Sequence, residues 1–220
     1  MKIDENKILK NIETGYDQMA DKFSSTRNFF WRDLSFIGDY AKAKDKIFDF
    51  GCGNGRILEI LQDKNIQYWG ADVSRKLINL AKTKYPQFKE HFSKIEVEES
   101  LPFKENFFNL VFSIAVFHHF PPKYQKKKIK EIYDLLKPDG KIILTAWNLD
   151  QDNLIPSKKW ETISEKEAYI SFQNNKGEKF SRYHYVFSEE DLRNLLEKAG
   201  FQVEKCDTIS KKNILIIARK

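Results

Sequence analysis

From residue 46 onward, short apolar runs alternate with amphipathic runs, and this alternation constrains the fold more than any other feature of the sequence. The apolar runs 46–50, 66–71 and 109–116 have the length of buried strands, whereas segments 74–84 and 123–137 have helical periodicity. Strands that are separated by helices run in the same direction, and the helices then cover both faces of the sheet. The sequence therefore predicts an α/β fold with a parallel sheet.

The remaining elements extend this prediction to a single domain. We expect further helices over 4–19, 31–40, 56–63 and 188–199, and further strands over 91–97, 141–146, 202–207 and 213–218. The last two strands are joined by a short turn and must pair antiparallel. The domain then consists of a helical cap (1–45), a cofactor-binding core (46–147), a polar, aromatic and irregular insertion that faces the substrate (148–187), and a C-terminal helix with a strand pair (188–220).

Charge and cysteine content limit the classes of partner and compartment. Residues 121–220 carry 20 basic and 15 acidic residues, an excess that indicates either an anionic partner or a solvated lysine-rich surface. Cys52 and Cys206 form neither a zinc motif nor a disulfide framework, so we expect a reducing cytoplasm. No apolar leader follows Met1, and the longest apolar stretch, 107–117, falls short of the roughly 20 residues of a membrane span. We therefore expect no membrane association.

A glycine-rich loop joins the first expected strand to its helix. Its sequence is Asp49-Phe50-Gly51-Cys52-Gly53-Asn54-Gly55-Arg56. Alternate glycines let the backbone turn sharply and approach a ligand, and a helix that follows offers free N–H groups. A dinucleotide loop would need glycine in place of Arg56, and the phosphate-loop pattern is absent. The loop is therefore either a structural turn or the site of a different ligand that is anionic or rich in hydrogen-bonding groups.

Asp72 favours the ligand-binding alternative. It ends the second expected strand at the same edge of the sheet, 17 positions after Gly55. A carboxylate at this place can accept hydrogen bonds from two ribose hydroxyls, although it could instead cap the helix that begins at Ser74. The loop and Asp72 together predict a cofactor that contains a ribose.

The order of these motifs resembles class I S-adenosylmethionine-dependent methyltransferases. The resemblance is carried by the glycine loop, by Asp72, and by the segments Leu101-Pro102-Phe103 and Leu136-Lys137-Pro138-Asp139-Gly140. It implies a Rossmann-like fold, with a mostly parallel seven-stranded sheet, an antiparallel last strand and helices on both faces. It also implies S-adenosylmethionine as the cofactor, bound by Asp49, Gly51, Cys52, Gly53, Gly55, Arg56, Asp72, Val73, Leu101 and Ala115.

One position departs from that family. The acidic residue that borders the adenine in similar methyltransferases stands four residues before the Leu-Pro-Phe segment, where this chain has Val97. We expect Glu98 or Glu99 to take its place.

Three further segments narrow the resemblance to the tRNA wobble-uridine carboxymethyl methyltransferases, which esterify 5-carboxymethyluridine. These segments are 16–27, 113–120 and 182–187. The resemblance implies tRNA as the substrate. It also implies a small zinc-ribbon-type activator protein that pairs along a sheet edge. The apolar residues Ile66, Tyr68 and Trp69 are compatible with such an interface and equally compatible with the core.

The chemistry of a carboxylate substrate fits these segments. A carboxylate is already ionised at neutral pH, so its methylation needs a cationic clamp and alignment but no general base. Arg27 and Arg182 are the expected clamp, and His118 and His119 are the candidate bases for a hydroxyl or nitrogen target. Further expected substrate contacts are Tyr16, Trp147, Tyr183, His184 and Tyr185.

Other functions remain open at this point. A small-molecule O- or N-methyltransferase and a non-catalytic binding subunit would use the same fold. Neighbouring histidines such as His118 and His119 should point in different directions, so we expect no bound metal. The lysine-rich helix around 123–130 is either a solvated face or a contact for RNA phosphates.

Overall fold

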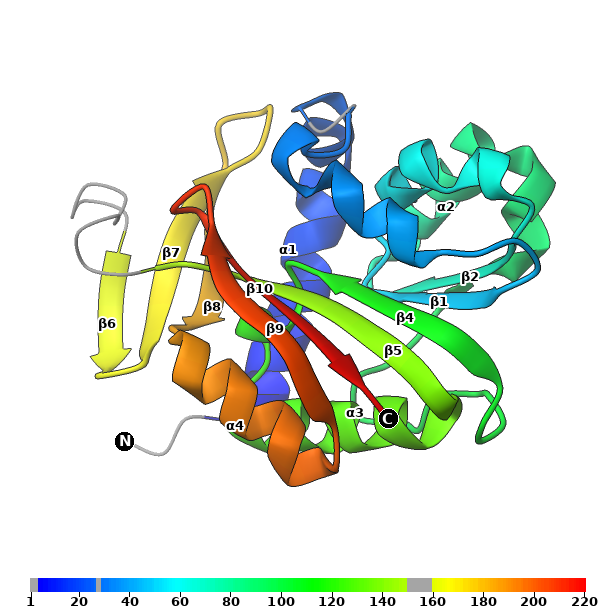
Figure 1. Cartoon of the computed structure of the whole chain (residues 1–220). Coiled ribbons are helices and arrows are strands. Elements are labelled where there is room, and N and C mark those ends of the chain that lie inside the picture. Colours follow the sequence, from blue (N-terminus) through cyan, green and yellow to red (C-terminus); the bar gives the residue numbers. More distant parts are fainter. Residues whose placement is uncertain (1–3, 27–28, 150–159) are drawn as a thin grey trace.

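The computed structural model describes residues 4–26, 29–149 and 160–220. A seven-stranded sheet forms its centre, with the strand order β3-β2-β1-β4-β5-β10-β9 (Figure 1). The first five strands are parallel, and β10 is antiparallel to both of its neighbours, β5 and β9. This sheet confirms the predicted mostly parallel topology with an antiparallel last strand. The strands are β1 (Lys46–Phe50), β2 (Gln67–Asp72), β3 (Phe92–Lys94), β4 (Phe108–Ile114), β5 (Leu136–Trp147), β9 (Gln202–Ile209) and β10 (Asn213–Arg219).

Helices cover both faces of the sheet, as predicted. One face packs against α3 (Pro122–Leu135) and α4 (Glu189–Ala199), whose buried side chains include Ile129, Ile132 and Leu196. The other face packs against α2 (Arg75–Lys84) and short 3₁₀ helices, with Ile78 and Leu58 in that core. The 3₁₀ helices on this face are η1 (Arg32–Tyr40), η2 (Arg56–Ile60), η3 (Gln62–Lys64) and η4 (Pro86–His91), whereas Phe117 of η5 (Phe117–His119) packs in the core on the α3 and α4 side.

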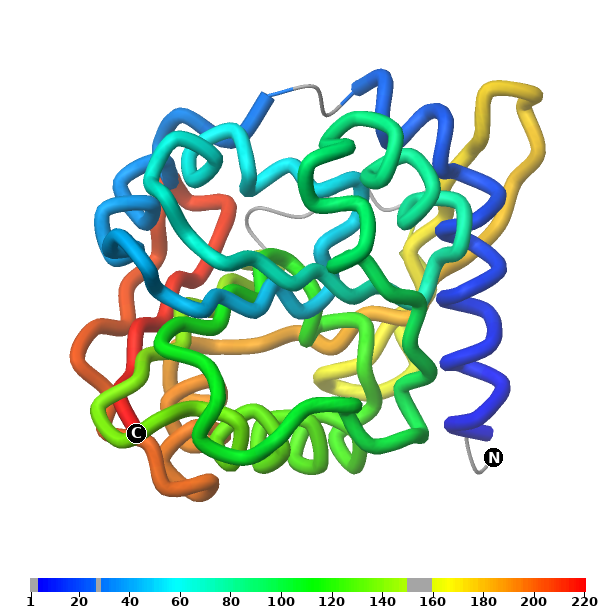
Figure 2. Tube along the Cα trace, turned by 90° about the vertical axis from the view of Figure 1, so that its right-hand side faces the viewer, coloured from blue at the N-terminus to red at the C-terminus, as the bar shows by residue number. Residues whose placement is uncertain are grey.

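The N-terminal helix α1 (Glu5–Thr26) is longer than predicted and runs along one side of the molecule (Figure 2). Among the hydrogen bonds that attach it to other parts of the chain, three reach α2, the glycine loop and the insertion. Asp17 accepts from the Ser74 hydroxyl at the start of α2, Ser24 accepts from Asn54 in the glycine loop, and Lys22 donates to the Gln173 carbonyl. These bonds fix α1 against both the core and the insertion.

The insertion differs from its prediction as an irregular segment. It holds a three-stranded antiparallel sheet of β6 (Trp160–Ser164), β7 (Glu167–Gln173) and β8 (Lys179–Tyr185). The turn between β7 and β8 explains the pairing, because the Asn174 side chain accepts from the amides of Lys176 and Glu178, and Gly177 has a φ of 81°. Residues 150–159 of the predicted insertion lie outside the described residues.

The segment predicted as a helix over 56–63 forms two separate 3₁₀ turns instead. Gly55 and Asn65 have positive φ values, so the backbone reverses at both ends and little length remains for an α-helix. The expected strand over 91–97 shortens to β3. No helix in the described part of the chain combines the length and the hydrophobicity that a bilayer span requires.

Candidate active site

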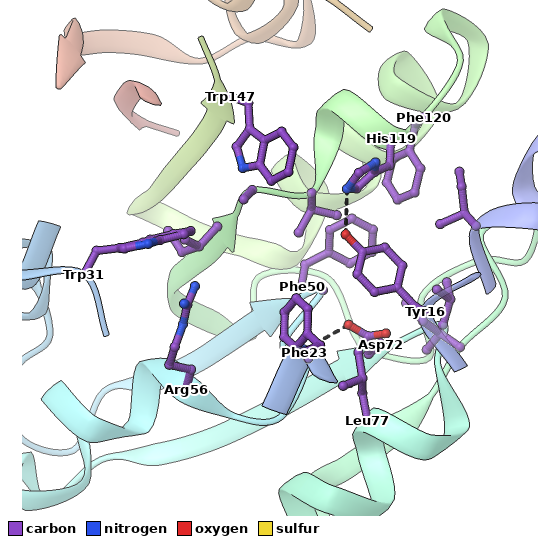
Figure 3. Close-up of a pocket in the computed structure, with 18 residues that line it drawn as sticks. Tyr16, Phe23, Trp31, Phe50, Arg56, Asp72, Leu77, His119, Phe120 and Trp147 are labelled. Atoms are coloured by element: carbon purple, nitrogen blue, oxygen red, sulfur yellow. Dashed lines mark hydrogen bonds between the residues drawn. The ribbon is translucent and has the colours of Figure 1, made fainter. Parts of the chain in front are cut away.

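The main cavity lies where β1, β2, β4 and β5 end, and α1 covers one side of it (Figure 3). It encloses about 730 Å³, including space that is open to solvent. Of the predicted site residues, those that line it are Tyr16, Gly51, Gly53, Arg56, Asp72, Val73, Ala115, His119 and Trp147. The structure thus brings together one half of the predicted site from five separate segments.

The glycine loop is held tightly against the sheet. The amides of Gly51 and Cys52 donate to the Ala71 carbonyl, at 2.8 and 3.0 Å. Gly51 has a φ of 78°, and a Cβ at this position would lie 2.3 Å from a methyl group of Val116. Only glycine fits there, because both the backbone conformation and the space exclude a side chain. Cys52 is buried, and burial raises the pKa of its thiol well above the usual value, so it is no nucleophile.

Asp72 lines the cavity and also holds the amide of Ser74, the residue that caps α2. Its carboxylate accepts from the Gly53 amide at 2.9 Å and from the Ser74 amide at 2.8 Å, while Ser74 itself caps α2. Each carboxylate oxygen can accept a second hydrogen bond, and Asp72 lines the cavity. Burial raises its pKa to about 6, although the Ser74 and Gly53 amides favour the charged form.

Asp49 lies beneath the loop and not on the wall of the main cavity. It is buried, and it accepts a hydrogen bond from the Tyr68 hydroxyl at 2.8 Å. Burial raises its pKa to about 7, against the effect of the Tyr68 bond. It lines a smaller adjoining cavity, with Cys52 and Gly53 among its neighbours there.

His119 is the histidine that faces the main cavity, and both of its ring nitrogens are engaged. Its Nδ1 lies 3.2 Å from the Tyr183 carbonyl, and its Nε2 lies 2.7 Å from the Tyr16 hydroxyl (Figure 3). A carbonyl only accepts, so Nδ1 carries the proton and Nε2 accepts from Tyr16. Burial lowers the pKa of His119 well below its usual range, which keeps the ring neutral.

His118 and His184 lie behind the cavity wall and support Trp147. The Trp147 amide donates to Nδ1 of His118 at 3.3 Å, and the two rings stack with centroids 5.0 Å apart. His184 stacks against the same indole at 5.3 Å. Burial lowers the pKa of His118 to about 3 and that of His184 well below its usual range, with Arg182 adding to both effects. Neither ring therefore acts as an acid or a cation at neutral pH.

The three histidines meet in space, contrary to the expectation that His118 and His119 point in different directions. The ring centroids of His118 and His119 are 4.2 Å apart. Potential ligand atoms of His118, His119 and His184 lie within 4.8 Å of one another. The cluster is nevertheless unsuited to a cation, because His119 has no uncommitted nitrogen and the positive Arg182 lies close enough to depress all three pKa values.

Of the two arginines of the predicted clamp, the structure describes only Arg182. Arg182 is only 2% exposed, and its guanidinium carbon lies 3.7 Å from the Phe172 ring centroid and 4.5 Å from that of Tyr16. It therefore lies behind Tyr16 and is separated from the cavity by that ring. Arg27 lies outside the described residues. Arg56 does line the cavity, where its guanidinium stacks 4.0 Å from the Trp31 ring centroid.

Several predicted residues do not reach the cavity wall. Glu98 and Glu99 are exposed, and Leu101 belongs to the core. The others outside the lining are Asp49, Cys52, Gly55, His118, Arg182, Tyr183, His184 and Tyr185.

The lining also includes residues that sequence reasoning missed, notably Phe23, Trp31, Ile95 and Phe120. Phe23 and Trp31 flank the segment that contains Arg27, so the aromatic residues around that arginine were a usable signal.

The chain matches the family described as "Methyltransferase domain" over residues 22–205, and it belongs to that family. It is 30% identical to the tRNA (carboxymethyluridine(34)-5-O)-methyltransferase of Arabidopsis thaliana over 71% of this chain and 37% of that protein. It therefore spans little more than a third of that relative. The Schizosaccharomyces pombe protein of the same name is 25% identical, and the alignment covers 89% of this chain and 89% of that protein.

A solved structure shares the fold at lower identity. It is the complex between the Haloferax volcanii Trm112 methyltransferase activator and the putative methyltransferase, and it aligns with a TM-score of 0.69, 16% identity, and coverage of 94% of this chain and 96% of that chain. At this identity the likeness concerns the fold alone.

Proposed function

We propose that this protein transfers the methyl group of S-adenosylmethionine to the carboxylate of 5-carboxymethyluridine at the wobble position of tRNA. The names of the two tRNA methyltransferase relatives support this substrate. The observation that carries the proposal is the state of His119, whose only acceptor nitrogen is occupied by Tyr16. Among the described cavity-lining residues, the candidate proton acceptors are Asp72, His119 and the Tyr16 hydroxyl that is bonded to His119, and a carboxylate substrate needs none of them.

The residues of the cavity fit the cofactor. S-adenosylmethionine, when bound, supplies an electrophilic methyl group on a positively charged sulfur. Asp72 has acceptor capacity left for ribose hydroxyls, and Gly51 and Gly53 leave room over the loop. Ala115, at the end of β4, has a φ of 60° and donates its amide to Thr145, so it presents the backbone to the cavity in a strained conformation.

The substrate side of the cavity combines aromatic faces with positive charge. Trp147 offers one face to an unpaired base, because His118 and His184 hold the indole from behind. Arg56 places a positive charge on the cavity wall. The positive charge of Arg182 acts on the cavity from behind the Tyr16 ring. Together they favour an anionic, planar substrate over a neutral one.

A methyl-transfer assay tests the proposal. The purified chain is incubated with labelled cofactor and bulk tRNA that contains 5-carboxymethyluridine, and the nucleosides are then separated. Label in the methyl ester of that nucleoside is the expected result. Label in another nucleoside, or transfer only to small molecules, would refute the substrate and favour the small-molecule alternative.

The pH dependence of turnover distinguishes a carboxylate substrate from one that needs a base. We expect the rate at saturating cofactor and tRNA to show no limb near pH 6.5, because burial keeps His118 and His119 neutral throughout that range. His119→Ala should lower the rate without introducing a new pH dependence. A histidine limb that is present in the wild type and disappears in this variant would contradict the proposal.

The lysine-rich helix α3 supplies fewer RNA contacts than its sequence suggested. Lys128 is fully buried, and Lys127 and Lys130 are close to the carboxylates of Glu131 and Asp134. Lys123 and Lys126 remain exposed, and α3 begins two residues after Phe120, which lines the cavity. We therefore assign the phosphate contacts of this helix to Lys123 and Lys126.

Salt dependence tests that assignment. We expect tRNA affinity to fall with salt, and Lys123→Glu/Lys126→Glu to reduce the log–log slope by about 0.7 for each phosphate that the protein no longer neutralises. A matched control is Lys82→Glu/Lys89→Glu, which makes the same charge change on α2 and η4. Equal effects of the two double variants would show that only net charge matters.

We also propose that a small activator protein binds the β3 edge of the sheet and that the protein acts in the cytoplasm. Of the two alternatives for Ile66, Tyr68 and Trp69, interface or core, the structure favours the core for the two residues in β2, because β2 is paired on both sides, Tyr68 is buried and Trp69 packs against the core. The edge strands of the seven-stranded sheet are β3 and β9, and β3 is the one next to β2, the strand that holds Tyr68 and Trp69. The shared fold with a methyltransferase that is complexed with an activator supports the existence of such a partner.

A further inference from the structure

We propose that Phe29 stacks on a nucleobase of the tRNA that lies next to the wobble uridine in the anticodon loop. This inference rests on the proposed tRNA substrate and adds a contact outside the cavity. It gives Phe29 a part in the selection of tRNA over smaller substrates and no part in binding the cofactor.

Phe29 differs from the other aromatic residues in its exposure. Its side chain is 82% exposed, and among the described large hydrophobic residues it is the only one that is exposed. The chain has 18 phenylalanines, and all of them except Phe29 are buried or half-buried. An aromatic ring in water gains free energy when another apolar or aromatic surface covers it. Phe29 is therefore suited to a contact that forms only when a partner binds.

A single exposed ring defines no site by itself, so the position of Phe29 matters. The two residues that follow it both line cavities. Phe30 lines the small cavity beside the glycine loop, and Trp31 lines the main cavity. Phe23, near the end of α1, lines both. Because two residues of chain span at most about 7 Å, Phe29 lies at the rim of the main cavity, with its ring in solvent.

The backbone that follows Phe29 is held against η2. The Phe30 amide donates to Oε2 of Glu59 at 2.7 Å. The guanidinium carbon of Arg56 lies 5.8 Å from the Phe30 ring centroid and 4.0 Å from that of Trp31. Trp31 and Arg56 lie next to each other at one side of the cavity (Figure 3). Phe29 is therefore presented at that side by a segment that packs against the end of the glycine loop.

The geometry of an RNA substrate supplies a surface that would cover this ring. An enzyme that modifies a base takes that base out of its stack and into a pocket. The neighbouring bases remain outside the pocket, although the backbone keeps them close to it. Each neighbour then loses a stacking partner, and aromatic side chains stack on unpaired bases of this kind. At the rim, Phe29 lies where a neighbouring base remains.

The composition of the segment favours RNA over a protein partner. Residues 27–32 include two arginines, three consecutive aromatic residues and no acidic residue. Proteins that bind single-stranded nucleic acid combine positive charge for the backbone with aromatic faces for the bases. A protein interface would need a larger apolar patch, whereas Phe30 and Trp31 are half-buried and Arg32 is exposed and charged.

Removal of a neighbouring base tests the contact. Full-length tRNA with 5-carboxymethyluridine at the wobble position is assembled in three forms: intact, and with an abasic nucleotide directly before or directly after that position. We expect Phe29→Ala to weaken binding of the intact tRNA about tenfold, on the scale of one base-stacking contact. One abasic form should bind wild type more weakly by a similar factor, and Phe29→Ala should have no further effect on that form.

Two other substitutions at the same position separate stacking from hydrophobicity. Phe29→Tyr keeps the aromatic face and should keep the affinity for intact tRNA. Phe29→Leu keeps an apolar side chain without that face and should lose most of the affinity, and full affinity in this variant would overturn the inference. Binding of S-adenosylhomocysteine should be the same in all variants, because Phe29 does not line the cavity.

The remaining outcomes also decide the matter. If Phe29→Ala weakens all three tRNA forms by the same factor, or leaves the affinity for intact tRNA unchanged, the inference is overturned. Loss of self-association in Phe29→Ala at unchanged tRNA affinity, measured by sedimentation, would assign the ring to a contact with a second copy of the chain and overturn it as well. Wild type that neither binds nor methylates the intact tRNA would refute the proposed function itself. Wild type that methylates this tRNA without any coupling between Phe29 and a neighbouring base would refute only the contact.

Discussion

Gly51→Ala is expected to destabilise the protein by about 3 kcal/mol and to weaken cofactor binding more than tenfold, since a left-handed non-glycine residue costs about 1 kcal/mol and an overpacked site adds about 2 kcal/mol. The added Cβ would lie 2.3 Å from one methyl group of Val116 and 2.9 Å from the other. The loop must move to relieve this contact, and the cavity-lining Gly53, whose amide is bonded to Asp72, moves with it. Urea unfolding and titration calorimetry measure the two effects.

A second glycine provides the matched control. Gly177 has a φ of 81°, close to that of Gly51, but a Cβ there would meet only a Gln173 side-chain atom, at 3.8 Å. Gly177→Ala should therefore cost only the conformational part, about 1 kcal/mol, and leave binding unchanged. In a Val116→Ala background the effect of Gly51→Ala on stability should shrink. Equal costs at the two glycines would show that the contact with Val116 is unimportant.

Asp72→Ala should weaken S-adenosylmethionine binding by about 1–3 kcal/mol, because it removes charged hydrogen bonds to the ribose. Its control is Ser74→Ala, which removes the cap of α2 but keeps the Ser74 amide that Asp72 binds. That variant should lose about 1 kcal/mol of stability and retain its affinity. If both variants weaken binding equally, Asp72 acts through the helix and not through the ribose.

The same carboxyl group makes the affinity of wild type depend on pH. Burial raises the pKa of Asp72 to about 6, and only the ionised form accepts hydrogen bonds with both oxygens. Affinity should therefore rise as the pH increases through about 6 and fall below it, and Asp72→Ala should lose this dependence. Calorimetric titrations between pH 5 and 8 check the sign.

Features that depend on local sequence were predictable from the sequence. Continuous apolar runs predicted the strands around the glycine loop, and the place of Asp72 at a strand end predicted its position. The glycine loop and Asp72 were therefore correctly predicted to lie together at the cavity. The capping box at Ser188 and the glycine that ends α4 were equally readable, because each cap is a matter of neighbouring residues.

Features that depend on distant contacts were not predictable. The position of Arg182 behind Tyr16 requires β8 to pack on α1, and nothing near either residue specifies that packing. Lys128 looked like part of a solvated row, yet its bond to the Glu99 carbonyl spans 29 positions in the sequence. Charge alone does not distinguish a lysine that faces solvent from one that is buried with its partners.

The attachment of α1 at three points has a kinetic consequence. Its bonds to Asn54 and Ser74 attach it beside Gly53 and Val73 of the cavity wall, and Tyr16 bonds to His119 within that wall, so a long ligand exchanges either through the side that α1 leaves uncovered or after these bonds open. Weakening them, as in Asp17→Asn, would then shorten the residence time of the spent cofactor. The rate of product release, and with it the turnover rate, would then depend on how firmly α1 is held against the cavity that its own residues Tyr16 and Phe23 line.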